Sequence, residues 1–265
     1  MSAKIFQKIN ELLEEGERFA AATIIRSEGS TPRGSGAKML ILEDGSTYGT
    51  VGGDCAERAV KDLALKSLED GESRTIEIKL EEEEKGGIGM ACGGEIEVSI
   101  EILQPTPKLV LIGGGRIAVE VVELARKVGF DVTVLDPFAD KSDFPDSAKI
   151  VSKSVEEGMS EIKVTPQSYI VIITRHKYDE PALTESLKTD ATYVGLMGSE
   201  NRVRSQFEAL EERGVDHDSL SQVHAPIGLD IGAETPEEIA VSIIAELIME
   251  RRSPESTGES FKIDY

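Results

Sequence analysis

A glycine turn between a strand pattern and a helix pattern constrains this sequence more than any other feature. The apolar, β-branched run at 108–112 stops at three consecutive glycines, 113–115, and apolar residues then recur at helical spacing. A second apolar run at 132–135 ends on Asp136, about 20 residues beyond the glycines. A strand, a glycine turn, a helix and a second strand, in this order, are typical of a dinucleotide-binding fold.

Each part of this unit is suited to holding a phosphorylated ligand. Gly113 permits the tight turn, Gly114 continues it, and Gly115 lets the backbone approach a pyrophosphate beside the free N–H groups of the helix. We expect Asp136 to bind a ribose 2′-hydroxyl and Arg116 to pair with a phosphate. The alternatives are an α/β turn that binds no ligand and an exposed arginine at a helix start.

Composition narrows the functional class. The formal net charge of −21 argues against a nucleic-acid footprint and against binding to an anionic membrane surface. No apolar run approaches the ~20 residues of a membrane span, and no apolar segment near the start is typical of a signal peptide. The sequence has two cysteines, too few for a disulfide framework. We therefore expect a cytoplasmic protein.

The 265 residues are enough for two domains, and the two prolines within 104–107 predict a linker between them. We predict a mixed α+β domain over 1–104, which carries both cysteines, and a Rossmann-like doubly wound parallel sheet over 105–265. In the first domain the patterns predict helices over 4–20 and 52–68, a hairpin turn at Asp44-Gly45, and strands over 21–26, 74–80 and 95–102. In the second they predict strands over 149–151, 169–174 and 191–195 and helices over 179–188, 199–213 and 235–251.

Further candidate residues follow the strands of the second domain, where a doubly wound sheet binds its ligands. His176 follows a predicted buried strand and could donate a proton or hold a ligand oxygen; the alternative is a polar residue that ends the strand. Gly198 and Ser199 open a helix and, with Asn201 and Arg202, could form a second anion site, although a simple N-cap explains Ser199 equally well.

In the first domain each cysteine lies next to a Gly-Gly pair, an arrangement that lets a bound group approach closely. Cys55 follows Gly52-Gly53-Asp54 near a helix start, and Cys92 precedes Gly93-Gly94. The helix start favours a thiolate, whereas the neighbouring Asp54 disfavours it. Buried structural cysteines are the alternative, and two cysteines alone do not make a zinc site. Arg33, the single arginine of the glycine-rich loop at 27–36, is a candidate cofactor contact.

Common enzyme signatures are missing from the sequence. None of the five tyrosines has a lysine four residues later, and neither a Gly-x-Ser-x-Gly elbow nor a His-Glu-x-x-His helix occurs. The motifs taken together nevertheless resemble the XdhC/CoxI family of xanthine dehydrogenase accessory factors, over nearly the whole chain from Ala22 to Met249. The segments that carry this resemblance are 29–39, 52–57, 92–94, 113–118, 134–137, 174–183, 193–199 and 225–246.

The resemblance implies a cofactor chaperone rather than an enzyme with its own turnover. Such a protein binds the molybdenum cofactor, as molybdopterin or a nucleotide form, and helps a cysteine desulfurase to sulfurate it. It then delivers the cofactor to an apo molybdenum hydroxylase and is typically a homodimer. The resemblance implies that the glycine turn holds the phosphate end of the cofactor. It also implies that Cys55 and Cys92 face its dithiolene or molybdenum end, where thiolates are suitable soft ligands and could relay a persulfide sulfur.

Two residues depart from the family pattern, and two other functions remain open. Arg116 stands where the family usually has His, and Asp54 stands where it tends to have Gly.

The glycine turn and Asp136 by themselves also fit an NAD(P)-dependent oxidoreductase, or a regulatory subunit that senses a nucleotide without turnover. We expect no bound metal ion other than that of the cofactor.

Overall fold

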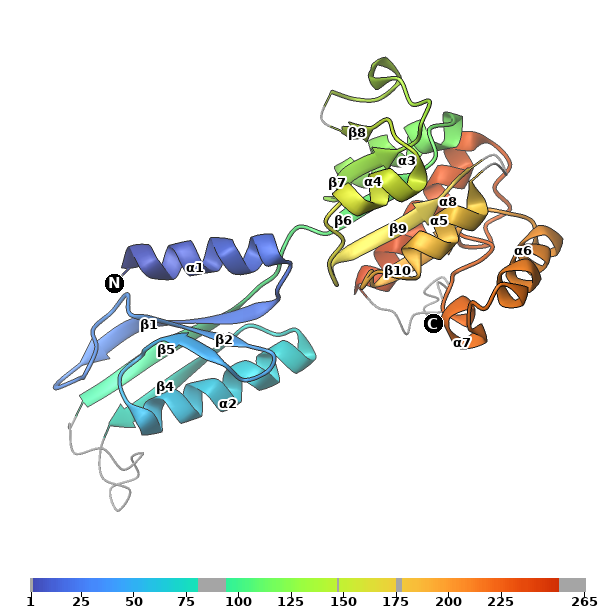
Figure 1. Ribbon diagram of the computed structural model, residues 1–265. Helices are drawn as coiled ribbons and strands as arrows, with labels where there is room; N and C mark the ends of the chain where they lie inside the picture. Colours follow the sequence, from blue (N-terminus) through green and yellow to red (C-terminus); the bar gives the residue numbers. More distant parts are fainter. Residues whose placement is uncertain (1, 81–93, 147, 175–177, 253–265) are drawn as a thin grey trace, which may run out of the picture. The chain divides into compact units, whose positions relative to one another are not determined.

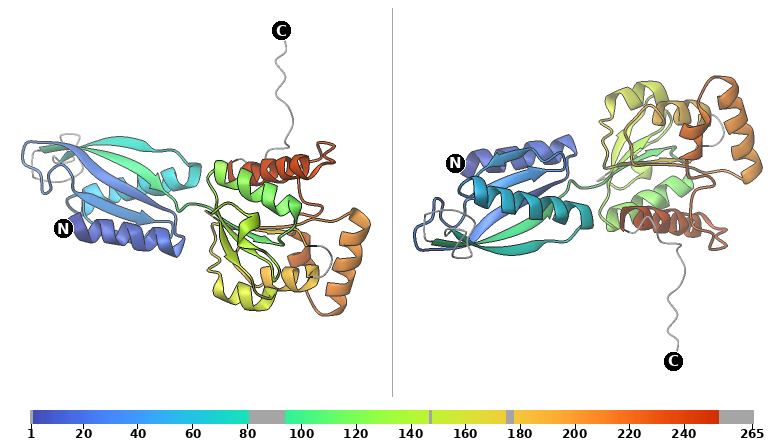
Figure 2. Two further views of the ribbon diagram at one scale, coloured as in Figure 1. Left: turned by 90° about the horizontal axis from the view of Figure 1, so that it is seen from above. Right: turned by 90° about the horizontal axis from the view of Figure 1, so that it is seen from below.

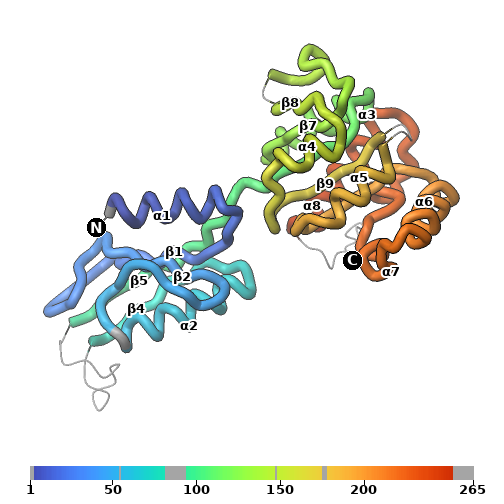
Figure 3. The backbone as a smooth tube through the Cα atoms, in the orientation of Figure 1, coloured from blue at the N-terminus to red at the C-terminus, as the bar shows by residue number. Residues whose placement is uncertain are grey.

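The computed structural model describes residues 2–80, 94–146, 148–174 and 178–252. The chain forms two compact units, Met1–Pro105 and Thr106–Tyr265, each built around its own five-stranded sheet. Figures 1 and 3 follow the chain through each unit in turn, and each is described by itself below.

The first unit is an antiparallel sheet between two helices. Its elements are α1 (Ser2–Glu15), β1 (Phe19–Glu28), β2 (Lys38–Leu42), β3 (Thr47–Gly49), α2 (Asp54–Asp70), β4 (Arg74–Leu80) and β5 (Gly94–Leu103), with strand order β3-β2-β1-β5-β4. Because side chains alternate along β1, Ala20 and Ala22 pack in the cluster that includes α2, whereas Phe19 and Ala21 pack with α1. The two helices therefore cover opposite faces of the sheet (Figure 2).

The predicted first helix is too long, whereas the predicted hairpin is confirmed. Helix α1 ends at Glu15, because Gly16 has a φ of +91° and the following N–H, that of Glu17, donates to Leu12 O at 2.9 Å. Phe19 then begins β1 as a fully buried residue. At the hairpin, Gly45 has a φ of +77° and donates to Leu42 O at 2.9 Å, so the glycine serves the tight turn as expected.

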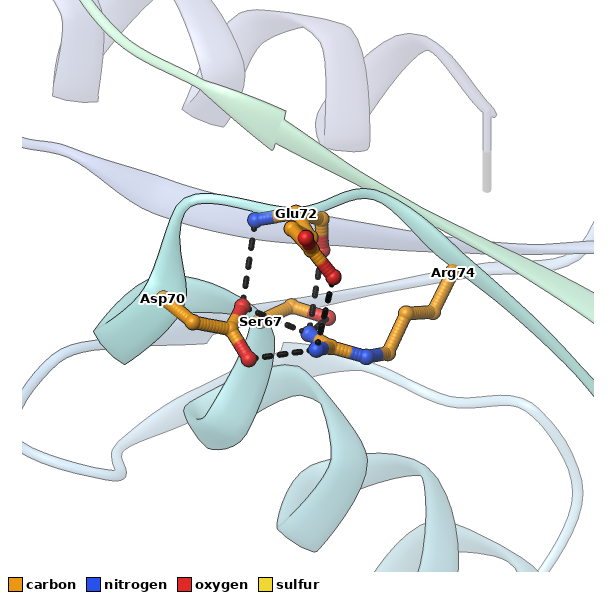
Figure 4. A network of polar contacts seen from close by, with 4 residues as sticks. All are labelled: Ser67, Asp70, Glu72 and Arg74. Atoms are coloured by element: carbon orange, nitrogen blue, oxygen red, sulfur yellow. Dashed lines mark hydrogen bonds and ion pairs between the residues drawn. The ribbon is translucent and has the colours of Figure 1, made fainter. Parts of the chain in front are cut away.

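An arginine network joins the end of α2 to the start of β4. The Arg74 guanidinium donates to Ser67 Oγ at 3.1 Å, to the Asp70 carboxylate and to the Glu72 backbone oxygen at 3.2 Å (Figure 4). The hydrogen bond from Arg74 lowers the pKa of Asp70. The carboxylates of this network are exposed to solvent, so the network serves a turn at the surface and not the core.

The second unit is a parallel sheet of the predicted doubly wound kind. Its elements are β6 (Lys108–Ile112), α3 (Arg116–Lys127), β7 (Asp131–Leu135), the 3₁₀ helix η2 (Lys141–Asp143), β8 (Lys149–Val151), α4 (Val155–Glu161), β9 (Ser168–Ile172), α5 (Asp179–Ser186), β10 (Tyr193–Leu196), α6 (Glu200–Glu212), α7 (His217–Ser221) and α8 (Pro236–Arg252). The strand order is β10-β9-β6-β7-β8, with all strands parallel, so the predicted fold class is confirmed.

Helices cover both faces of this sheet. Helices α3 and α8 pack on one face through residues such as Val121 and Ile243, whereas α4, α5 and α6 pack on the other through residues such as Met159 and Leu183 (Figures 1 and 2). After β6 the chain moves outward through β7 and β8, then returns to place β9 on the opposite side of β6. The carboxyl ends of β6 and β9 therefore form the switch point at which such sheets bind ligands.

Helix α8 begins as its sequence predicts. Thr235 Oγ1 accepts a hydrogen bond from the Glu238 N–H at 3.2 Å, and the Glu238 carboxylate accepts one from the Thr235 N–H at 3.0 Å, which completes a capping box. Helices α2 and α8, with 17 residues each, are the longest in the described part of the chain. None of the described helices has both the length and the apolar character needed to cross a bilayer.

Candidate functional site

The glycine turn after β6 is closely packed at its first residue. Gly113 has a φ of +123°, and its N–H donates to Leu135 O, at the end of β7, at 3.0 Å. A Cβ atom at this position would lie 2.2 Å from Ile173 O, at the end of β9. Only glycine satisfies both the backbone angle and this approach, so Gly113 holds three strand ends together.

Asp136 binds the same turn through both carboxylate oxygens. Oδ2 accepts a hydrogen bond from the Gly114 N–H at 2.9 Å, and Oδ1 accepts one from the Phe138 N–H at 2.7 Å. The Gly114 N–H is therefore already engaged within the protein. Each carboxylate oxygen keeps a further lone pair, so Asp136 can still accept a hydrogen bond from a ligand.

The start of α3 is open to a ligand. Gly115 is the N-cap residue, and no side chain in the described part of the chain accepts a hydrogen bond from the N–H groups of the first turn. Arg116, the first residue of the helix, is exposed, and its side chain makes no hydrogen bond or ion pair with any other described residue. The predicted phosphate-binding elements of this helix start are thus available.

A cavity of about 290 Å³ lies at the switch point. Its lining consists of Gly114, Gly115, Asp136, Phe138, Ile173, Thr174 and Tyr178. The fold thus brings the glycine turn, the residue at the end of β7 and the segment after β9 together around one space. The volume is at the lower limit for small-molecule sites, roughly 300 Å³, so the cavity has room for a small molecule or for one part of a larger one.

A buried carboxylate stands behind one wall of this cavity. Asp179, at the start of α5, is 1% exposed and accepts hydrogen bonds from Thr174 Oγ1, from the Arg202 guanidinium and from Gln206 Nε2, the last at 2.6 Å. Burial lowers the pKa of Arg202. Arg202 Nε and Gln206 Oε1 are buried without a partner among the described residues. The network fixes Thr174 relative to α6.

The predicted second anion site at the start of α6 is arranged differently from the expectation. Ser199 is the N-cap residue, as predicted, but its hydroxyl accepts no hydrogen bond from the helix. Gly198 is in close contact with Val203, because a Cβ there would lie 3.3 Å from Val203 Cγ2. Arg202, which the prediction assigned to an anion, is paired with the carboxylate of Asp179.

In the first unit, three loops that contain or adjoin candidate residues converge. Cys55 is a free, half-buried cysteine in the first turn of α2. A Cβ at Gly52 would lie 3.7 Å from Pro32, beside the exposed Arg33. A Cβ at Gly94 would lie 2.4 Å from Ser30 O, so only glycine fits there.

Three predictions concern parts of the chain that the structure does not describe. Cys92 and His176 are outside the described residues, and so is the side chain of Asp54. Within the described ranges, no three His, Cys, Asp or Glu side chains gather in a way that could hold a metal ion.

The sequence reasoning missed a buried polar cluster between the segment after β10 and α8. The Glu246 carboxylate is hydrogen bonded to His224 Nδ1 at 3.0 Å and accepts a hydrogen bond from the Gly228 N–H. The rings of His224 and Tyr193 are 4.4 Å apart between centroids, and the Tyr193 hydroxyl is buried without a hydrogen-bond partner in the described part of the chain. The sequence did contain a signal for this cluster, because the charged residue Glu246 interrupts the apolar face of α8.

The surroundings of this cluster alter the pKa of each member. The hydrogen bond to Glu246 raises the pKa of His224. Burial alone would raise the pKa of Glu246, but the hydrogen bonds with His224 and Gly228 outweigh it and lower that pKa. Burial, assisted by the charge of Glu246, raises the pKa of Tyr193. The cluster therefore holds a carboxylate and a more basic imidazole beside the loop that contains Gly228.

Comparison with known proteins gives several matches over most of the chain. The Escherichia coli K12 protein YqeB is 34% identical over 248 residues, which cover 92% of this chain but 46% of YqeB, so the chain spans about half of that relative. A probable xanthine dehydrogenase subunit from Bacillus subtilis 168 is 26% identical, with 92% of this chain and 96% of the relative covered. The molybdenum cofactor insertion chaperone PaoD of E. coli K12 is 22% identical, with 89% and 85% covered.

Two family descriptions match consecutive parts of the sequence. Residues 12–79 match the XdhC and CoxI family, and residues 109–247 match the XdhC Rossmann domain. The second match contains the parallel sheet, the glycine turn and the whole lining of the switch-point cavity. The first contains most of the antiparallel sheet and Cys55. The chain therefore belongs to the XdhC and CoxI family.

Proposed function

We propose that this protein is an accessory factor that binds the molybdenum cofactor and assists its sulfuration and its insertion into a molybdenum hydroxylase of the xanthine dehydrogenase or CO dehydrogenase type. Family membership supports an accessory role, since one relative is named as a probable subunit of xanthine dehydrogenase and another as a molybdenum cofactor insertion chaperone. The partners are then an apo hydroxylase and a cysteine desulfurase, and the working form is a homodimer.

The observation that carries this proposal is the switch-point cavity beside the uncapped start of α3. The N–H groups of the first turn of α3, together with the Arg116 guanidinium, form a site for the phosphate of the cofactor. The cavity accommodates an adjoining part of the molecule, and the remainder lies outside it. When bound, the cofactor supplies the dithiolene-held molybdenum that the client enzyme uses. The residues of this chain bind and orient it.

Cys55 is the residue that we assign to the sulfur end of the cofactor, together with Cys92. Cys55 lies in the first turn of α2, and it is half-buried rather than enclosed in the core. A thiolate there could ligate a soft metal or carry a persulfide. His176, Arg33, Gly198 and Ser199 remain candidate contacts in this proposal.

The test is recovery of the cofactor with the purified protein. The chain is produced in a host that makes molybdopterin and in one that does not, and bound pterin is measured by fluorescence after oxidation. Pterin above the level of the deficient host supports the proposal, and its absence contradicts it. Arg116→Glu should reduce retention, whereas Lys127→Glu, the same charge change at the exposed far end of α3, should not.

A second experiment addresses delivery. Apo hydroxylase is incubated with the loaded protein and a cysteine desulfurase, and recovery of hydroxylase activity is measured. We expect Cys55→Ala to bind pterin but to deliver a cofactor with less activity. Equal activation by Cys55→Ala and the unchanged protein would remove Cys55 from the proposal.

An NAD(P)-dependent oxidoreductase is the alternative that the fold itself favours. The strand order and the position of Asp136 at the end of β7 match those of dinucleotide-binding sheets. Titration with NAD and NADP in both oxidation states tests this alternative. Binding that is weakened by Asp136→Ala would support it, and the absence of binding would eliminate it.

A further inference from the structure

The Thr174 hydroxyl in the switch-point cavity can accept a hydrogen bond from a ligand but cannot donate one. Thr174 is 4% exposed and lines the cavity, and its hydroxyl proton is given to Asp179. The Asp179 carboxylate is held as an acceptor by Arg202 and Gln206, so it cannot return a proton. The Thr174 oxygen therefore offers a ligand only its remaining lone pair.

Asp136, the one charged side chain in the described lining, also acts only as an acceptor. Asp136 accepts hydrogen bonds from the Gly114 and Phe138 N–H groups and has lone pairs left over. A phosphate placed between Asp136 and Thr174 would meet a carboxylate, and the Tyr178 hydroxyl is the one donor among the described side chains of the lining. A group that carries N–H or O–H donors would instead be satisfied on both sides.

The remaining side chains favour a flat ring. Phe138 lines the cavity and is 76% exposed, which is unusual for so large an apolar residue. Ile173 and the ring of Tyr178 complete the apolar part of the lining. Exposed aromatic side chains beside hydrogen-bond acceptors are suited to a planar heterocycle, because the ring face stacks while the ring edge forms hydrogen bonds.

We propose that this cavity receives the pterin ring of the cofactor rather than its phosphate. The pterin amino group and the adjacent ring N–H donate to the Asp136 carboxylate and to Thr174 Oγ1, and Phe138 packs against the ring face. The phosphate is bound outside this part of the cavity, at the start of α3 and Arg116. This assignment rests on the proposed function and specifies the part of the cofactor that each group recognises.

The test uses the full chain and two fluorescent ring compounds, free pterin and lumazine. Lumazine has a carbonyl in place of the pterin amino group, so it turns an acceptor toward Asp136. We expect pterin to bind at least about 10-fold more tightly than lumazine. Asp136→Asn and Thr174→Val should each reduce this preference, and Phe138→Ala should weaken both ligands alike. Thr174→Ser should retain the preference, and Asp140→Asn, at an exposed carboxylate nearby, should leave it unchanged.

Two further binding experiments test the other ligands that the acceptor groups of Asp136 and Thr174 could recognise. Ribonucleoside diphosphates are compared with their 2′,3′-dideoxy analogues, and inorganic phosphate is added as a competitor. Dependence on the ribose hydroxyls without a preference for pterin over lumazine would overturn the assignment in favour of a ribose site. Displacement of pterin by phosphate would also overturn it. If the purified protein retains the cofactor but shows no preference for pterin over lumazine, this inference fails and the proposed function stands. If the protein prefers pterin but retains no cofactor, the ring assignment stands and the proposed function fails.

Discussion

The two sheets differ in what they bury. Among the described residues, the first unit buries a single polar side chain, Ser67, whereas the second buries seven, including the carboxylates of Asp179 and Glu246. In the antiparallel sheet a tight hairpin joins β2 to β3, and both core clusters are apolar. The parallel sheet instead leaves long connections at the carboxyl ends of its strands.

The difference shows where each unit requires precise positioning. Asp179 fixes Thr174 at the end of β9, and Glu246 fixes the Gly228 loop beyond β10. Burying a charge carries a desolvation penalty. The position of a buried carboxylate therefore indicates which loop needs a defined geometry. In the first unit the candidate residues Arg33 and Cys55 lie on loops or helix starts outside the core. Substitutions that break these buried contacts should therefore affect stability and function together in the second unit. Substitutions of Arg33 or Cys55 in the first unit should affect function with little change in stability.

The strongest test of this comparison removes a carboxylate from each unit. Asp179→Ala leaves the Arg202 guanidinium and the Thr174 hydroxyl without their partner, so we expect a loss of about 3–5 kcal/mol in the free energy of unfolding of the second unit. Asp70→Ala breaks an ion pair of similar geometry at the surface (Figure 4) and should cost much less. Urea denaturation of the two variants measures both values. Equal losses would remove the distinction between the units.

A glycine pair gives a second contrast, of smaller size. Gly113→Ala places a Cβ 2.2 Å from Ile173 O at a φ of +123°, so we expect a loss of about 3 kcal/mol together with weaker ligand binding. Gly71→Ala, at the C-terminal cap of α2, has a φ of +77° but no atom within 4 Å of the new Cβ, and should cost about 1 kcal/mol. Thermal unfolding compares the two. A mild Gly113→Ala variant would mean that the strand ends can move apart.

The sequence predicted the parallel sheet and its glycine turn because their signals are local. Apolar runs define the strands, and a capping box at Thr235 defines the start of α8. The polar partners of the site could not be predicted in this way. Asp179 meets Arg202 only after α5 and α6 join the same core cluster, and Gly114 meets Asp136 across 22 residues. These contacts depend on strand order, which hydrophobic periodicity does not encode.

The predicted length of the first helix was wrong for a related reason. Its apolar stripe continues to Phe19, and periodicity alone treats that residue as helical. In the fold, Gly16 ends the helix and Phe19 begins the central strand β1, since burial between β2 and β5 outweighs one more helical turn. A glycine at a possible C-cap position was the local signal that deserved greater weight.

The His224–Glu246 pair predicts a pH dependence confined to the second unit. The pKa of His224 is raised on folding, so its contribution to stability is complete below about pH 6.5 and is lost as the pH rises past the folded pKa. The pKa of Glu246 is lowered, so its contribution is present above about pH 4.5 and is lost as the pH falls past its folded pKa. Both contributions are therefore present together between these pH values.

We expect His224→Gln to cost up to about 1 kcal/mol near pH 5.5 and less near pH 8.5, because the His224 side chain is 35% exposed and solvent screens the pair. Denaturation at the two pH values measures the difference. His217→Gln is the matched control, since His217 also faces a carboxylate, Glu211, and the hydrogen bond raises its pKa, but its side chain is 82% exposed. A pH dependence of the same size in both variants would assign the effect to general surface charge rather than to the buried cluster.

We expect the smallest effect on stability at Cys55, the residue to which we assign the largest functional role in the first unit. Cys55→Ser changes one atom of a half-buried side chain, so the free energy of unfolding should change by no more than about 0.5 kcal/mol. Sulfane sulfur passed from the persulfide of a cysteine desulfurase to the protein, with the desulfurase thiol as the leaving group, should nevertheless fall, with Ser67→Ala as a variant that leaves the Cys55 thiol in place. A loss of stability with unchanged sulfur transfer would mean that the Cys55 thiol is a packing group. The first unit would then resemble the second, in which candidate residues such as Gly113 and Asp136 also hold the fold.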